Sequence, residues 1–482
     1  MGDSTLDANT LDVVAALRAT VDGLVLTSTD DGYAAEVSGF DLSQVHHPHV
    51  VVAAASAADV EATVRAAAAA RVPITVVGSG HGDIPTVTTG ILLNTRRINS
   101  VSVDIAARTA RVGVGATWHD VLAIAAPAGL APVCGSAPAV GVGGYLLGGG
   151  IGPIGRTVGF SSDRVRAFEL VCADGDLRTA TAQEDPDLYW ALRGGKGGFG
   201  VVTSVTVDLL VLPSIYGGGE YYPAAEIPAL LRAYQVLAKS AVPNELSTSV
   251  AVLRMPDIPV LPPPLRGQTV AHLRVGYVGD PADRAAWAAT AEGLLRPLRA
   301  VVGKPLLGAI GELPYADIGT IHNDPTMPSA HATAGILLNE LDPATIEAIL
   351  EVAGPGVNTP LAIVEIRHLG GAFAAPGAPR DAVSGREAAF GMWVSGAPMS
   401  PGFDPAVMST TSAAVRGVLE AVRPWSAGVV QINFCGAVNT ADEASRAWPA
   451  DITDTLAGIR RRYDPDTLFP YVPGSSRPAP TN

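Results

Sequence analysis

The sequence predicts an α+β protein of more than one domain. Three observations support this: apolar strand patterns and helix patterns alternate through the first part of the chain, a glycine-rich loop follows many of these strands, and the composition changes near Ser214. The chain has 482 residues, of which 48% are hydrophobic and 16% charged, which excludes a largely disordered protein. At roughly 100–200 residues per domain, two or three domains are expected.

The first domain is expected to alternate strands and helices. The apolar run Val50–Ala54 predicts a buried strand, and Ser56 is expected to cap a helix that extends to Ala70, with acidic residues in its positively polarised first turn. The further predicted strands are Ile74–Val77, Ile91–Asn94, Val101–Ile105, Ala110–Val114, Arg166–Ala173 and Val201–Leu210, and the further predicted helices are Thr117–Ala125 and Asp185–Leu192.

A second domain is expected to begin near Ser214, where proline-rich stretches such as Pro256–Pro264 occur. Its expected helices are Ala224–Leu237, Asp280–Leu295 and Pro343–Val352, and its expected strands are Leu246–Arg254, Thr269–Tyr277 and Ala362–Leu369. From Val429 to Pro473 the chain is expected to form a strand, a helix and a closing turn. The predicted parts are therefore residues 1–213, residues 214–428 and a C-terminal return at 429–482.

Charge and composition exclude several classes of function. The 32 basic and 46 acidic residues give a net charge of −14, and no basic stripe with interleaved aromatics is present, so no nucleic-acid partner is expected. The apolar stretch Val50–Val77 is interrupted by Asp59, Glu61 and Arg65, so no membrane span is expected. The N-terminus is acidic and three cysteines lack CxxC spacing, which predicts a cytoplasmic protein, and no metal site is expected. The protein is expected to be a monomer or a homodimer, and the sequence does not decide between them.

Glycine clusters are the strongest signal in the first domain. They lie at Gly78–Gly82, Gly141–Gly144, Gly148–Gly152 and Gly194–Gly200. Each cluster alone can be a structural turn, but four of them near predicted strands indicate backbone N–H groups that converge on an extended anionic ligand such as a pyrophosphate.

Two of these clusters match the dinucleotide pattern GxGxxG, at Gly150–Gly155 and Gly195–Gly200. Neither match opens a helix after a strand, as a Rossmann site requires. A P-loop is excluded because Lys196 is followed by glycine rather than by Ser or Thr.

The order and spacing of the motifs resemble the berberine bridge enzyme-like FAD-linked oxidases, a bacterial member of which is expected from the heavy Ala, Arg and Gly usage. The resemblance rests on VGSGHG at 77–82, PAVGVGGYLLGGGIG at 138–152, ALRGGKGGFGVVT at 191–203 and YDPDTLF at 463–469. These oxidases belong to the vanillyl-alcohol oxidase superfamily with its PCMH-type FAD-binding domain. The resemblance implies such a domain, made of two α/β subdomains, and a substrate domain whose antiparallel sheet, covered by helices, roofs the isoalloxazine ring.

The resemblance also implies FAD with one covalent link, through His81. The attachment needs a neutral imidazole on a tight loop, whereas a lone histidine at a strand end would be read as ordinary packing. Many relatives have a second link through a cysteine, but Ala137 stands at that position, and Cys134 is expected to be a buried thiol. The residues expected to contact FAD are Val77, Gly78, Ser79, Gly80, His81, Gly82, Ser136, Val140, Gly141, Gly143, Gly144, Gly148, Gly149, Gly150, Gly152, Gly200, Val201, Val202, Asn433 and Tyr471.

The catalytic residues are less clearly marked. Relatives often carry Tyr-x-Asn in a C-terminal strand, where this chain has Gln431-Ile-Asn433, and a glutamine cannot act as a base. Tyr145 replaces a frequent histidine of the family. The candidates for catalysis are Tyr145, Arg367, Gln431 and Asn433.

The expected roof strand carries Glu365 and Arg367 on one face and His368 on the other. Arg367 can therefore hold a substrate anion or polarise a carbonyl, or it can belong to an ordinary ion pair. His322 and His331 can line a pocket or serve the fold.

The resemblance implies an enzyme that passes hydride from a small metabolite of secondary metabolism to FAD and then to O₂, giving H₂O₂. Val140 stands where relatives that use oxygen carry valine, and few charged residues are expected near the roof, which favours an apolar or mildly polar substrate. Two alternatives remain open: a flavin-dependent oxygenase or rearrangement enzyme, and a non-redox cyclase or binder that uses FAD as scaffold.

Overall fold

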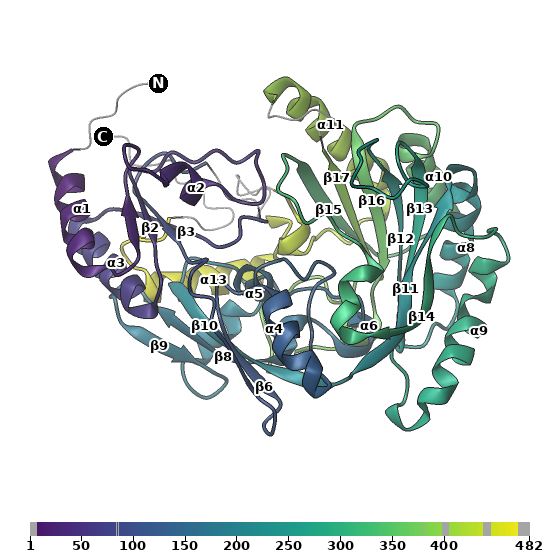
Figure 1. Ribbon diagram of the computed structural model, residues 1–482, viewed down its shortest axis with the longest axis horizontal. Helices are drawn as coiled ribbons and strands as arrows, with labels where there is room; N and C mark the ends of the chain where they lie inside the picture. Colours follow the sequence, from purple (N-terminus) through teal and green to yellow (C-terminus); the bar gives the residue numbers. More distant parts are fainter. Residues whose placement is uncertain are drawn as a thin grey trace.

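Three β-sheets organise the computed structural model of the protein (Figure 1). It describes residues 7–82, 84, 86–377, 379–397, 404–436 and 445–470. Two sheets belong to the first part of the chain, and the third is made by strands between residues 214 and 396. One continuous hydrophobic core runs from the second sheet into the third, which fixes the site between them.

The first sheet is small and mostly parallel. Its strand order is β1 (Leu24–Leu26), β2 (Val50–Ala53), β4 (Ile91–Asn94) and β3 (Ile74–Val77), with only β1 antiparallel. Helix α3 (Ala57–Ala70) packs against α1 (Ala8–Thr20), and α2 (Tyr33–Val37) contacts β2. As expected, the Ser56 side chain caps α3.

The second sheet is antiparallel, and the cluster Gly194–Gly200 leads directly into one of its strands. The clusters Gly141–Gly144 and Gly148–Gly152 lie at the start of helix α5 (Val142–Leu147) and just after it. Its order is β5 (Val101–Asp104), β6 (Thr109–Gly113), β10 (Val201–Val211), β8 (Val165–Val171) and β9 (Leu177–Ala180), and β7 (Leu130–Pro132) also pairs with β10. The associated helices are α4 (Trp118–Ala125), α5 (Val142–Leu147), α6 (Gly155–Val158) and α7 (Pro186–Leu192).

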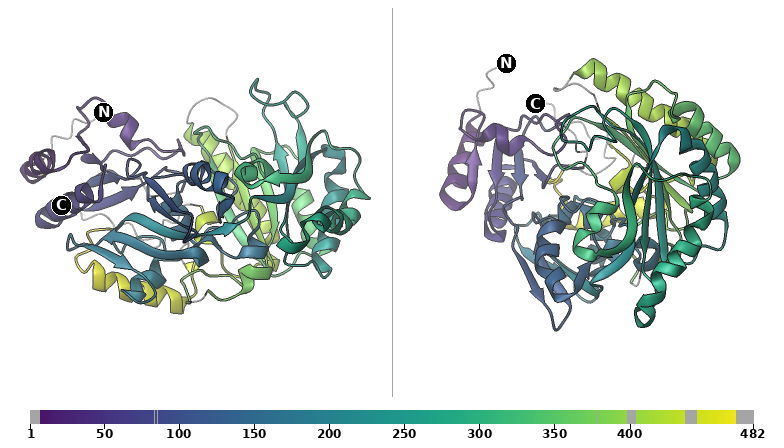
Figure 2. Two further views of the ribbon diagram at one scale, coloured as in Figure 1. Left: turned by 60° about the horizontal axis from the view of Figure 1, so that its bottom comes forward. Right: turned by 45° about the vertical axis from the view of Figure 1, so that its right-hand side comes forward.

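The third sheet is antiparallel throughout and stands upright beside the first two (Figure 1). Its order is β14 (Leu307–Pro314), β11 (Ser214–Pro223), β13 (Thr269–Tyr277), β12 (Leu246–Arg254), β16 (Leu361–His368), β17 (Phe390–Gly396) and β15 (Ala332–Leu338). Helices cover its outer face, as the right-hand view of Figure 2 shows, and its inner face is turned toward the first part of the chain. These helices are α8 (Ile227–Lys239), α9 (Trp287–Arg299), α10 (Pro343–Ala353) and α11 (Pro405–Val422).

The C-terminal segment returns to the first part of the chain. Helix α13 (Ala450–Tyr463), yellow in Figures 1 and 2, packs on α7. The strand expected just after Val429 is wrong, because Ile432–Phe434 forms a 3₁₀ turn. Side-chain hydrogen bonds from Gln431 to Ser384 O and from Asn433 to Tyr145 O hold this turn.

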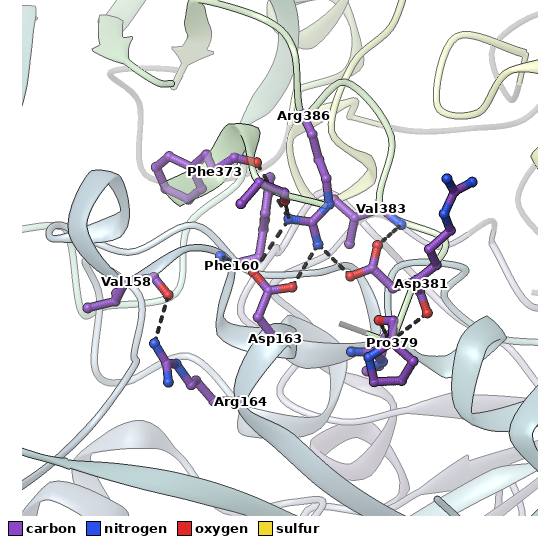
Figure 3. Close-up of polar contacts among 12 residues, drawn as sticks. Val158, Phe160, Asp163, Arg164, Phe373, Pro379, Asp381, Val383 and Arg386 are labelled. Carbon is purple, nitrogen blue, oxygen red and sulfur yellow. Dashed lines mark hydrogen bonds and ion pairs between the residues drawn. The ribbon is translucent and has the colours of Figure 1, made fainter. Parts of the chain in front are cut away.

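A buried ionic cluster joins the connection between β16 and β17 to the first part of the chain (Figure 3). Arg386 donates to Asp163 at 2.7 Å and to Asp381, and its guanidinium lies 4.6 Å from the ring centre of Phe160. Close packing adds to this junction, since a Cβ at Gly155 would stand 1.8 Å from the ring of Phe373. Among the described residues, no helix is long and apolar enough to cross a membrane.

Candidate FAD and substrate site

His81 lies on the loop that follows β3, held between two other segments. Its ring stacks on Phe40 with centroids 3.8 Å apart and planes 13° apart, and its Nδ1 lies 3.0 Å from Ser79 Oγ. Gly80 has φ +70°, and a Cβ there would stand 2.5 Å from Gly39 Cα, so the loop requires glycine at this close approach. The imidazole is therefore kept in one position.

The environment of His81 keeps its imidazole neutral. Burial, with the nearby His331, lowers the pKa of His81 from 6.5 to about 4. The rings of His331 and Phe40 meet edge to face with their centroids 6.3 Å apart, so a segment of the second part of the chain reaches this loop. A neutral ring nitrogen is the form that can act as a nucleophile.

The glycine clusters converge, as the sequence predicts for an extended ligand. A Cβ at Gly141 would lie 3.2 Å from Ser79 Oγ, which brings the first two clusters together. The amide of Lys196 donates to Leu147 O at 2.9 Å and its ammonium donates to Gly144 O at 2.9 Å, which brings the fourth cluster to α5. Segments more than a hundred residues apart thus surround one region.

Asn433 completes this region from the C-terminal return. Its Nδ2 donates to Tyr145 O at 2.8 Å, and its Oδ1 accepts from the Lys196 ammonium. A Cβ at Gly148 would stand 2.1 Å from Asn433 Oδ1, so only glycine admits this side chain. These contacts place Asn433 among the glycine loops, and its predicted contact with FAD stays a prediction.

The open faces of these glycines fit a bound cofactor. A Cβ built at Gly82, Gly144 or Gly197 would meet no atom within 4 Å, and one at Gly78 would meet only Thr95 Oγ1 at 3.9 Å. Glycine at such positions leaves room for close backbone approach by a ligand.

The charge of Lys196 among the glycine loops also favours a bound anionic cofactor. No ion pair among the described residues includes Lys196, and burial lowers the pKa of its ammonium from 10.5 to about 8. A half-buried cation without a carboxylate is suited to an anionic group of a ligand. The donor set therefore fits FAD, with its pyrophosphate and electron-accepting ring.

Other expected cofactor residues have protein neighbours where a side chain would stand. A Cβ at Gly150 would meet the ring of Tyr145 at 2.4 Å, and one at Gly152 would meet Cys134 O at 2.3 Å. Gly143, Gly149 and Gly200 are packed in the same way, Val201 and Val202 are buried in β10, and Val77 ends β3. Ser136 Oγ donates to Asp324 at 2.6 Å, and Tyr471 lies outside the described residues.

Tyr145, a candidate for catalysis, and Cys134, an expected buried thiol, both make contacts within the protein. The Tyr145 hydroxyl accepts from Ser161 Oγ at 3.0 Å, its ring meets Trp118 edge-on, and burial raises its pKa above the usual range. Cys134 is buried against Tyr315, and burial raises the pKa of its thiol to about 12. A thiol with so high a pKa is inert toward the flavin.

The roof carries a buried ionic cluster, so the expectation of few charges there is wrong. Glu365 pairs with Arg274 at 3.0 Å, Arg367 at 3.2 Å and His322 at 3.4 Å. Burial opposes ionisation of Glu365, but Arg367 and Arg274 hold its pKa well below its usual range. As the strand register requires, Glu365 and Arg367 share a face, while His368 contacts Arg156.

Two hollows meet at Arg367. One, with about 330 Å³ of empty space, is mainly apolar and is lined by residues of β15, β16 and β17, the C-terminal return and Ile151. The other hollow has about 280 Å³ of empty space, and seven of its fourteen lining residues are polar. These polar residues come from β12, β13 and β16 and include His322, so this hollow is named the polar hollow, although the rest of its lining, with the loop after Gly152, is apolar. Gln431 lines the apolar hollow, and its amide is held by Ser384 O.

Three residues that matter here were not singled out from the sequence. Phe40 belongs to no recognisable motif, and Arg274 lies in a predicted strand whose residue pattern does not set it apart. Lys196 was used only to exclude a P-loop. The position of Lys196 as a charged residue within a run of glycines was the signal that could have singled it out.

Comparison with known proteins agrees with this geometry. Residues 48–181 match the family described as "FAD binding domain". The chain is similar to (R)-6-hydroxynicotine oxidase of Paenarthrobacter nicotinovorans, with 28% identity over 94% of this chain and 96% of that protein. It is also similar to an FAD-dependent monooxygenase of Fusarium proliferatum, with 38% identity over 37% of this chain and 35% of that protein.

Solved structures share the fold across nearly the whole chain. The structure of 6-hydroxy-D-nicotine oxidase from Arthrobacter nicotinovorans superposes with a TM-score of 0.77 at 25% identity, covering 93% of this chain and 97% of that one. Physcomitrella patens BBE-like 1 superposes with a TM-score of 0.79 at 20% identity, covering 97% and 100%.

Proposed function

Because the chain is an FAD-dependent oxidoreductase with the PCMH-type FAD-binding fold, we propose that it is an oxidase whose FAD is bound covalently through His81. The observation that carries the proposal is the neutral imidazole of His81, stacked on Phe40 beside a cradle of open glycines. In this proposal residues 1–213 and 429–482 hold FAD, and residues 214–428 hold the substrate.

The covalent link joins an imidazole nitrogen of His81 to the 8α carbon of the flavin. The methyl C–H and the imidazole N–H each lose a proton, and the two electrons released pass to O₂, which with two protons becomes H₂O₂. The fixed, uncharged ring of His81 supplies the nucleophile without a prior deprotonation.

In turnover, bound FAD would supply the acceptor for hydride from the substrate, and O₂ would take up the two electrons with two protons to give H₂O₂. The open backbone of Gly144 and Gly197 would receive FAD, and the Lys196 ammonium would favour negative charge on it. Val140 is half-buried beside Gly141 and is small enough to leave room for oxygen.

Neither Tyr145 nor Gln431 is placed to act as a base. The tyrosine hydroxyl is buried on Ser161 with a raised pKa, and the glutamine amide has no useful acid–base chemistry. Asn433 orients the Lys196 ammonium, and Arg367 faces the two hollows, so we assign these side chains to positioning and binding.

A flavin-dependent oxygenase is the second candidate. The fungal relative of 38% identity is named an FAD-dependent monooxygenase, although the match covers only 37% of this chain. Turnover under ¹⁸O₂ separates the two: an oxidase releases labelled H₂O₂ and an unlabelled product, whereas an oxygenase transfers the label to the product.

The test of the attachment is the intact mass of acid-denatured protein with peptide mapping. We expect the mass of one FAD on the His81 peptide, and its loss in His81→Ala. The matched control is His119→Ala, an exposed histidine of α4. Acid-stable flavin in His81→Ala would refute the attachment, and loss of flavin in His119→Ala would show that the assay reports folding instead.

A further inference from the structure

The cluster at the roof is positively charged. Arg274 and Arg367 share the single carboxylate of Glu365. The histidines that line or touch the polar hollow are neutral, because burial lowers the pKa of His322, His272 and His368.

Two neighbouring charged groups do not supply the missing negative charge. Behind His368, the Arg156 guanidinium adds a cation that is bound by backbone carbonyls such as Leu246 O at 2.8 Å. Asp324 also acts on His322 but accepts a hydrogen bond from Ser136 and lines neither hollow. Burying unbalanced charge is costly unless a counter-charge is supplied.

Arg367 is the member of the cluster with spare donor capacity. Its side chain is 12% exposed, whereas those of Arg274 and Glu365 are 3% and 5% exposed. Its contacts to Glu365, His322 and Ile151 O are all long, between 3.2 and 3.4 Å. A guanidinium has five N–H donors, so Arg367 can bind a further oxyanion.

Buried polar atoms without hydrogen-bond partners lie at the polar hollow. Ser249 Oγ and His322 Nδ1 have no hydrogen-bond partner within the described structure, and both residues are at least nine-tenths buried and line the polar hollow. A buried polar group without a partner destabilises the fold, so such a pair indicates a site that a ligand or its water completes.

The other hollow suits a carbon skeleton. Ile336, Leu337, Met392, Trp393 and Phe434 are among the residues that line it.

We propose that the substrate is an organic acid, whose carboxylate binds Arg367 and enters the polar hollow while its apolar or aromatic portion occupies the apolar hollow. This rests on the proposed oxidase function and names its substrate class. A carboxylate on Arg367 would balance the second guanidinium and give Ser249 an acceptor.

The test compares an acid with its neutral isostere by titration calorimetry on the holoenzyme. The probes are 3-phenylpropanoate and 3-phenylpropanamide. We expect the acid to bind at least tenfold more tightly, Arg367→Gln to abolish this preference, and Arg367→Lys to keep part of it. Arg166→Gln, an exposed arginine paired with Asp208, should leave the preference unchanged.

Equal binding of acid and amide, no acid binding at millimolar concentration, or an acid preference that survives Arg367→Gln would each overturn the inference. The flavin assay is independent of this one. A colourless protein that prefers the acid would refute the oxidase but leave the anion site, whereas a peroxide-forming flavoprotein that is indifferent to the charge would refute the substrate class alone.

Discussion

Gly144→Ala separates the stability of the fold from the binding of FAD. Gly144 lies within α5 with a helical backbone, and an added Cβ would meet no atom within 4 Å. Replacing an interior helical glycine by alanine stabilises a helix by roughly 0.5–1 kcal/mol. The protein without FAD should therefore be slightly more stable, although the substitution lies at the proposed site.

The same methyl group should impair cofactor binding. Carbon atoms in contact stand about 3.5–4.0 Å apart, so a flavin resting on this glycine backbone must move away or leave when a Cβ projects into its space. We expect less than half of the wild-type flavin per protein, measured by absorbance after acid precipitation, together with an unchanged or raised melting temperature.

Gly417→Ala provides the matched control. Gly417 lies in α11 and also has no atom within 4 Å of an added Cβ, so it should show the same helical gain with full flavin content. A Gly144→Ala protein with wild-type flavin content and an unchanged flavin spectrum would refute the cradle at Gly144. A strongly destabilised variant would refute the open space read from the structure.

Three further predictions concern buried ionisable groups. Arg386→Met should lower the free energy of unfolding by about 3–5 kcal/mol in urea titrations, because it leaves the carboxylates of Asp381 and Asp163 without their cation; adding Asp381→Asn should recover part of the loss, and no recovery would contradict this reading. Burial raises the pKa of Asp381 above its ordinary value of 3.8. The protonated carboxyl therefore stabilises the folded protein below pH 3.8, and this stabilisation is lost as pH rises through the pKa of the folded state. The loss of unfolding free energy in Arg386→Met should therefore become smaller on acidification. Attachment of FAD to the apoprotein should proceed at a constant rate above about pH 5 and fall to half near pH 4, the pKa of His81, whereas a midpoint near 6.5 would show an ordinary exposed imidazole.

Regular elements with strong local signals were predicted well. The strand at Val50, the Ser56-capped helix and the strands at Leu246–Arg254 and Thr269–Tyr277 are confirmed. Each of these elements has an apolar pattern or a clear cap, and both of these signals are local in the sequence.

The strands that were not predicted lack such a signal. β11 contains three consecutive glycines, and at Gly218 and Gly219 the space of a side chain is taken by Ala309 O and by the ring of His272. β14, β15, β17 and helix α11 were also missed. The segment after Val429 was wrongly predicted as a strand, because its β-branched residues favour one while distant hydrogen-bond partners impose a turn.

The sequence by itself determined the glycine loops and the histidine within one of them, because these features follow from local residue order and spacing. The return of the C-terminal segment was implied by the family resemblance, and in the structure α13 packs on α7. Only the tertiary structure decided the surroundings of Lys196, the neutrality of His81 and the two hollows that meet at Arg367. Burial and charge balance depend on side chains from segments far apart in the chain, as when Arg367 meets Ile151 and His322, and no local pattern encodes such encounters.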